Sequence, residues 1–149
     1  MTDHGKIAED YFKRGYNCAQ SVLLAFGDVT DLDEETALRI SSSFGGGLGR
    51  LREVCGAVSG GAMVLGLLRG YTDPEDREGK KAHYVLVRDF AERFREQNGS
   101  IICRELLAGI PKTSGGDPEA RTPEYYKKRP CADLCRIAAQ VIDEMLLSD

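Results

Sequence analysis

Apolar residues recur along most of the chain at the three- and four-residue steps of an amphipathic helix. From about Asp3 to Phe26 they form one continuous stripe, so we expect a single long helix there, with Cys18 near its middle. Asp31 with Glu34 is a variant of the capping box and predicts a second helix over Asp33 to Ser43. Because no segment alternates with a period of two, the pattern predicts an all-α protein without a sheet.

A glycine-rich stretch from Phe44 to Gly70 interrupts this pattern. Gly45 to Gly49 predicts an irregular turn, and its Gly-x-Gly repeats lack the strand and the Gly-Lys-Ser/Thr ending of a nucleotide loop. Ala57 to Leu68 then predicts a helix that is apolar nearly all round, as is typical of a helix surrounded by others. Glycine costs a helix roughly 1 kcal/mol relative to alanine. We therefore expect Gly56 and Gly60 to let another backbone or a ligand come close, which makes them candidate cofactor-binding positions.

The second half of the chain predicts three further helices and a long loop. A helix is expected from about Asp73 to Gln97, a short one over Ile101 to Leu107, and a last one from Pro130 to about Leu147. Gly109 to Arg129 is rich in proline and glycine, and a loop of this length in a compact domain is usually functional or disordered. One interpretation is a lid whose apolar contact is Tyr125-Tyr126.

These elements predict a single helical domain over residues 1–149, a bundle of five to six helices around the glycine-rich central helix. The net charge of −4 and the absence of a basic run argue against a nucleic-acid partner. The chain does not begin with a signal peptide, and its longest apolar run, Ala62 to Leu68, is too short to span a bilayer. We therefore expect a cytoplasmic protein. A homo-oligomer is left open, because the small residues of the central helix also suit a subunit interface.

Cysteine is the residue type that carries the candidate chemistry. The chain has five of them, in no Cys-x-x-Cys arrangement: Cys18, Cys55, Cys103, Cys131 and Cys135. In a reducing compartment such a set indicates catalysis, redox sensing or metal binding rather than a disulfide framework. Cys55, Cys103 and Cys131 each fall in or near the first turn of a predicted helix. The helix dipole there stabilises a thiolate, so we expect their pKa values to be lowered.

The cysteine spacing resembles the C_GCAxxG_C_C family of redox-active proteins over nearly the whole chain. The matching segments are Tyr16-Asn17-Cys18-Ala19-Gln20-Ser21-Val22, Cys55-Gly56-Ala57-Val58-Ser59-Gly60, Cys103-Arg104-Glu105-Leu106-Leu107 and Cys131-Ala132-Asp133-Leu134. Val54 stands where the family label has a glycine, and Cys135 lies outside the pattern. The resemblance implies a helical protein with redox or metal chemistry, but no particular reaction.

Three hypotheses follow for the function. In the first, Cys18, Cys55, Cys103 and Cys131 are catalytic and two of them cycle between dithiol and disulfide, with a redox partner protein or a small thiol. In the second, the same four cysteines bind zinc or an iron–sulfur cluster. In the third, the protein is a helical interaction module without a cofactor, and the cysteines are core residues. Whether the protein is an enzyme stays open. We expect the four cysteines to converge on one site and Cys135 to lie outside it.

Overall fold

The computed structural model describes residues 2–147, and within them the chain forms nine α-helices and one π-helix but no strand. The helices, of which six have eight or more residues, are α1 (His4–Lys13), α2 (Cys18–Ala25), α3 (Gly27–Thr30), α4 (Glu34–Ser42), α5 (Gly56–Arg69), α6 (Arg77–Asn98), α7 (Cys103–Leu106), α8 (Pro123–Lys128), α9 (Cys131–Ile142) and the π-helix η1 (Asp143–Leu147). The prediction of an all-α protein is confirmed.

The expected long first helix is wrong, because it is two helices. The chain turns at Gly15, whose φ of +107° belongs to the left-handed region that glycine adopts without a steric cost. Asn17 then caps α2: its side chain accepts from the backbone N–H of Gln20 at 2.8 Å, and the Gln20 side chain accepts from Asn17 N–H at 3.1 Å. This reciprocal pair is a capping box. Cys18 therefore opens a helix and does not lie in the middle of one.

Other boundaries also differ because the caps lie elsewhere. Asp33, and not Asp31, caps α4 by accepting from Thr36 N–H. Asp76 caps α6 through Gly79 N–H, so this helix begins three residues after Pro74. The Pro/Gly-rich stretch holds the short helix α8, whose cap is Thr122.

Two helices of the bundle, α2 and α9, have the most neighbours. α2 packs against α1, α3, α4, α5 and α9, while α9 packs against α1, α2, α5, α6 and η1. Six of the eight residues of α2 are buried, against seven of the fourteen in α5. The structure therefore does not show the expected arrangement around a glycine-rich central helix. α5 exposes part of its C-terminal half, where Leu67 lies at the surface.

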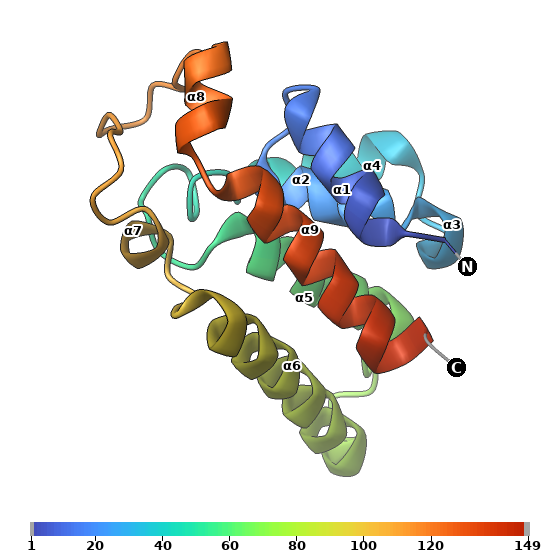
Figure 1. The fold of residues 1–149 in the computed structure, drawn as a ribbon. Helices are drawn as coiled ribbons and strands as arrows, with labels where there is room; N and C mark the ends of the chain where they lie inside the picture. The colour runs from blue at the N-terminus through green and yellow to red at the C-terminus, as the bar shows by residue number, and fades with distance from the viewer. Residues whose placement is uncertain (1, 148–149) are drawn as a thin grey trace.

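The chain start is anchored, although its position in the sequence suggests fraying. His4 is buried and stacks on Phe26 with ring centroids 4.1 Å apart. Its Nδ1 lies 2.6 Å from Asp143 Oδ1, and its Nε2 lies 2.9 Å from Asp28 Oδ1. His4 thereby joins the beginning of α1 to α3 and η1. This junction lies at the end of the bundle opposite to α7 and α8 (Figure 1).

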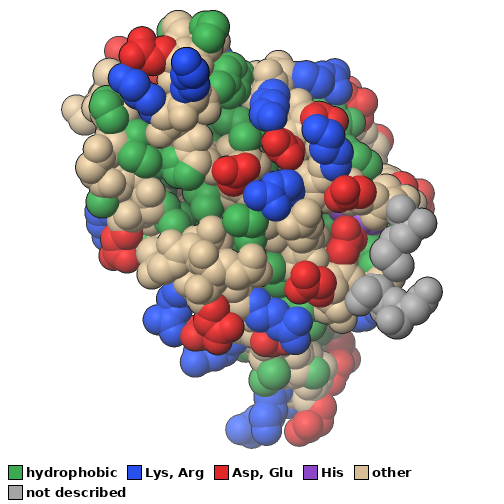
Figure 2. Space-filling view, viewed as in Figure 1, with side chains coloured by type: hydrophobic (Ala, Val, Ile, Leu, Met, Phe, Trp, Pro, Cys, Tyr) green, Lys and Arg blue, Asp and Glu red, His purple; other side chains and the backbone are tan. Residues whose placement is uncertain are grey.

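Loops and short helices gather at the other end of the bundle. Residues 43–54, α7, the loop 107–122 and α8 lie beside the first turns of α5 and α9 (Figure 1). On the face seen in Figure 2, hydrophobic side chains collect between α8 and the start of α9, whereas charges of both signs are mixed over α1 and α6. No helix of residues 2–147 is long and apolar enough to cross a membrane.

Candidate functional site

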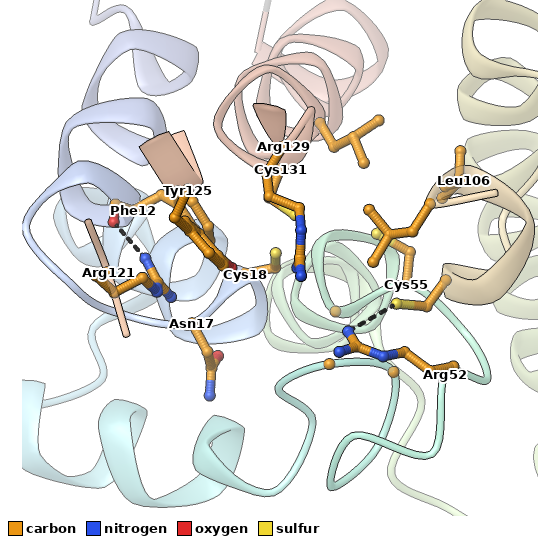
Figure 3. A pocket seen from close by; sticks show the side chains of 16 residues that line it. Phe12, Asn17, Cys18, Arg52, Cys55, Leu106, Arg121, Tyr125, Arg129 and Cys131 are labelled. Carbon is orange, nitrogen blue, oxygen red and sulfur yellow. Dashed lines mark hydrogen bonds between the residues drawn. The ribbon is translucent and has the colours of Figure 1, made fainter. Parts of the chain in front are cut away.

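Four cysteines line one small cavity at the loop-rich end of the bundle (Figure 3). The cavity, of about 60 Å³, is called the cysteine cavity below. Its sulfur-bearing residues are Cys18, Cys55, Cys103 and Cys131. They come from four helices, and each is the first residue or the N-cap of its helix. All five cysteines are free thiols, and none lies at disulfide distance from another.

Cys55 and Cys103 are brought together by a short backbone pairing. Val54 and Ile102 form an isolated antiparallel bridge. Cys55 N–H donates to Ile101 C=O at 2.8 Å, and Cys103 N–H donates to Glu53 C=O at 2.6 Å. Backbone hydrogen bonds across the bridge thus fix the starts of α5 and α7 beside each other. This pairing of distant segments left no periodic signal in the sequence.

Cys18, Cys131 and Cys135 form the second group of sulfurs. Cys18 and Cys131 open α2 and α9, whose packing against each other brings the two thiols near enough for each to shift the pKa of the other. Cys135 lies one turn further along α9 and is fully buried. Its Sγ donates to Cys18 C=O at 3.8 Å, so it touches the group from the side of the core and does not line the cavity.

The thiols of this group hold their protons firmly. The Cys131 thiol by itself lowers the pKa of Cys18, but hydrogen bonding with Cys135 and burial outweigh it and raise that pKa well above its ordinary value. The hydrogen bond with Cys18, together with burial, raises the pKa of Cys131 well above the ordinary value, against the charges of Arg129 and Arg121. Burial also raises the pKa of Cys135.

Burial likewise raises the pKa of Cys55 to about 12, although backbone N–H groups of Ala57 and Val58 oppose the shift. The expectation that the helix start lowers the pKa values of Cys55 and Cys131 is therefore wrong. The N–H groups do favour the thiolate at Cys55, but the loss of water around a buried anion costs more. The resting cavity holds neutral thiols at these positions.

The two glycines expected to admit a ligand serve helix packing. A Cβ on Gly60 would lie 2.6 Å from Ala19 C=O, and one on Gly56 would lie 3.0 Å from Cys18 Cβ. Both glycines therefore let α5 approach the backbone of α2, which places the α5 start beside Cys18. Gly56 also lines the cysteine cavity, whereas Gly60 does not. A role of either residue in binding a cofactor stays a prediction.

Three arginines line the same cavity, although the sequence analysis named only cysteines and glycines as candidate site residues. They are Arg52, Arg121 and Arg129. Arg52 donates to Cys103 Sγ at 3.8 Å, as the dashed line in Figure 3 marks. Arg121 lies 4.2 Å over the Phe12 ring and donates to the carbonyl groups of Phe12 and Tyr16. Arg129 lies 4.7 Å over the Tyr125 ring, so aromatic faces and carbonyl groups hold both guanidinium groups in place.

Arg52 owes its position to an unusual backbone. Every residue from Gly46 to Arg50 has a positive φ, between 52° and 74°, and Arg52 has a φ of 62°. A non-glycine residue pays roughly 1 kcal/mol or more for this left-handed conformation. Leu48, Arg50 and Arg52 all pay it. Backbone strain of this kind gathers at functional sites, and here it turns two arginines toward the cavity region.

A metal site was tested against the same side chains. Among residues 2–147, no group of three or more Cys, His, Asp or Glu residues is arranged to hold a metal ion. The residues of the cavity, as they lie in this structure, do not fit zinc or a cluster.

A comparison with protein families places the chain among known sequences. The family model described as "Putative redox-active protein (C_GCAxxG_C_C)" matches residues 16–145, which include all five cysteines. The chain belongs to this family. No curated protein and no solved structure matches the chain.

Proposed function

We propose that the cysteine cavity carries out thiol–disulfide exchange, with Cys18 and Cys131 as the pair that cycles. The observation that carries the proposal is that these two thiols lie near each other at a small cavity that two further cysteines line. Membership in a redox-active family supports it. Free buried thiols also suit a reducing, cytoplasmic compartment.

The reaction that we propose balances with a small organic disulfide as the oxidant. Cys131 gives up its proton and attacks one sulfur of the disulfide, and the other half leaves as a thiolate that takes up a proton. Cys18 then attacks Cys131 Sγ, and the second half of the substrate leaves as a thiol. Two electrons pass from the cysteine pair to the substrate, so two protein thiols become one disulfide and one substrate disulfide becomes two thiols. A small thiol in excess reverses the sequence.

Two features of the cavity assist the attack. The charges of Arg129 and Arg121 favour the anion of Cys131, although burial outweighs them in the resting protein. A substrate that brings its own sulfur into the cavity needs Cys131 to ionise only at the moment of attack. Cys55 and Cys103 line the other wall, where Arg52 contacts Cys103 Sγ. They form a second pair that can receive the disulfide by a further exchange.

The test oxidises the protein with a small disulfide and maps the disulfide by peptide mass spectrometry. Wild type is expected to form a Cys18–Cys131 disulfide, and Cys18→Ser and Cys131→Ser are expected to lose it. Cys135→Ser is the matched control, since it removes a buried thiol one helical turn from Cys131 but outside the cavity. Circular dichroism checks that each variant folds. A protein that retains five free thiols, or a disulfide that vanishes with Cys135→Ser and survives Cys18→Ser, contradicts the proposal.

A further inference from the structure

Three arginines converge on one carboxylate next to the cysteine cavity. Glu119 Oε2 lies 2.5 Å from Arg129 Nη2, 3.4 Å from Arg50 Nη2 and 3.4 Å from Arg52 Nη2. All four side chains are largely buried, and that of Arg129 is only 3% exposed. Burying a charge is costly unless it is paired. Three guanidinium groups share one carboxylate, so the group carries an excess of two positive charges.

The carboxylate itself is held as an anion. Partial burial alone would raise the pKa of Glu119, but the hydrogen bond from Arg129, the Thr113 N–H and the charge of Arg50 together lower it. Glu119 thus marks the position at which the arginines stabilise a negative charge.

A hollow beside these arginines adjoins the cysteine cavity. It measures about 280 Å³, and Arg50, Arg52, Arg121, Arg129 and Glu119 are among the residues around it. We call it the arginine vestibule. Arg52, Arg121 and Arg129 border the cysteine cavity as well, so the two spaces share one wall. A molecule that reached from one space into the other would have one end near the cysteines and the other among the arginines.

The loop that carries Glu119 is fixed to Arg50 by contacts besides that of the Glu119 carboxylate. Arg50 donates to Thr113 C=O at 3.1 Å, to Gly115 C=O at 2.9 Å and to Asp117 C=O. Carbonyl groups therefore keep the loop on Arg50 when the carboxylate is neutralised or displaced. These contacts of Arg50 with carbonyl groups do not involve the Glu119 carboxylate.

We propose that the arginine vestibule binds a carboxylate of a small anionic disulfide or thiol, and that Glu119 occupies this place until the substrate displaces it. The proposal rests on the thiol–disulfide function above and names its substrate class. Arginine pairs with carboxylates through parallel, charge-assisted hydrogen bonds, and a buried, desolvated setting strengthens them. The vestibule selects for charge, and the cysteine cavity supplies the chemistry.

The kinetic test uses three symmetric disulfides that differ in charge: dithiodipropionate, bis(2-hydroxyethyl) disulfide and cystamine, which are anionic, neutral and cationic. For each disulfide, the rate of free-thiol loss from the reduced protein is measured. It is divided by the rate at which a small free thiol reacts with the same disulfide, which corrects for differences in the intrinsic reactivity of the three disulfides. The normalised rate with the anionic disulfide is expected to exceed that with the cationic one by about tenfold or more, the factor that one charge-assisted pair supplies.

The variants separate charge selection from chemistry. Arg52→Gln is expected to lower the anionic-to-neutral ratio by about tenfold, and Arg52→Lys to restore part of it. Glu119→Gln is expected to raise the ratio, because the amide keeps the shape and gives up the competing charge. Arg93→Gln is the matched control: Arg93 lies on α6, pairs with Asp89, and is outside both spaces. Its ratio is expected to equal that of wild type.

A redox-inert probe keeps the two proposals distinguishable. Suberate is the carbon analogue of dithiodipropionate and cannot exchange sulfur. Calorimetry is expected to detect its binding to wild type, tighter binding to Glu119→Gln and weaker binding to Arg52→Gln. Equal ratios in wild type and Arg52→Gln, or weaker binding of suberate to Glu119→Gln, would overturn the vestibule while disulfide formation still stands. Suberate binding without any disulfide formation would overturn the redox function and keep the anion site.

Discussion

The two walls of the site are built by different physical means. We call the side with Cys18, Cys55, Cys103 and Cys131 the sulfur wall, and the side with Arg50, Arg52 and Arg129 the arginine wall. The cysteines of the sulfur wall open helices, and Gly56 and Gly60 let α5 lie against the backbone of α2. The arginine wall stands on the loop 43–54 and the loop before α8, where left-handed backbone and ion pairs set the positions. The sulfur wall is fixed by packing, which resists change in volume. The arginine wall is fixed by strain and charge, which a ligand can exchange for its own contacts.

The walls also differ in the charge that they carry at rest. Hydrogen bonding between thiols together with burial raises the pKa values of Cys18 and Cys131, and burial raises that of Cys55, whereas Glu119 keeps its neighbouring arginines paired. A site with neutral thiols and surplus positive charge attracts an anion before any thiolate forms. The difference predicts an order of events in which charge recognition precedes chemistry.

The largest expected effect is a loss of stability when the packing behind the sulfur wall is disrupted. Gly60→Leu is expected to lower the free energy of unfolding by more than about 2 kcal/mol, because an overpacked core must shift backbone. A Cβ at this position already lies 2.6 Å from Ala19 C=O. Gly66→Leu on the same helix is the control, since a Cβ there has nothing within 4 Å. Chemical denaturation measures both. Equal midpoints for the two variants would show that α2 and α5 do not need the close approach.

The second effect uses alkaline pH to probe the neutral thiols. An unfolded thiol loses its proton near its ordinary pKa of 9.0, while folded Cys55 keeps it to about 12. The folded state therefore binds more protons in this window, and the stability that this supplies is full below pH 9 and is lost as pH rises toward 12. The free energy of unfolding should fall by about 1 kcal/mol between pH 9 and pH 10 from this group.

The control for this effect is Cys55→Ala, which removes the titrating group. Its unfolding free energy is expected to fall less steeply over the same pH range than that of wild type. Denaturant titrations at three or four pH values give both slopes. Parallel slopes would mean that the Cys55 thiolate is as well solvated in the folded protein as in the unfolded chain.

The sequence predicted the sulfur wall better than the arginine wall, and the reason is physical. Helices leave a period in the sequence, so the helical class and the helix starts at Cys55, Cys103 and Cys131 could be inferred. The start at Cys18 was missed although Asn17 and Gln20 form a capping box. That signal is short, and the continuous apolar stripe concealed it.

The arginine wall leaves no such period. Arg50 and Arg129 meet through Glu119, and neither spacing nor composition indicates a contact between residues so far apart in the chain. The sign of the thiol pKa shifts was missed for a related reason. A helix start is visible in the sequence, but the burial that outweighs it depends on which elements cover the cysteine. Charge and burial at this site are properties of the tertiary structure.

The smallest expected effect releases strain in the arginine wall. Leu48 has a φ of +72° and lies at the surface, so the burial of its side chain does not offset the cost of its left-handed backbone. Leu48→Gly is expected to raise the free energy of unfolding by roughly 0.5–1 kcal/mol. This is the steric cost of the left-handed backbone that glycine removes, minus the conformational entropy that glycine adds to the unfolded chain. Ile40→Gly, at an exposed position within the regular helix α4, is expected to lower the free energy of unfolding by roughly 0.5 kcal/mol. Both variants remove an exposed aliphatic side chain, so stability changes of opposite sign would reflect the difference in backbone conformation at the two positions. If both variants lose stability equally in chemical denaturation, the loop conformation carries no strain, and the arginines are placed by their ion pairs alone.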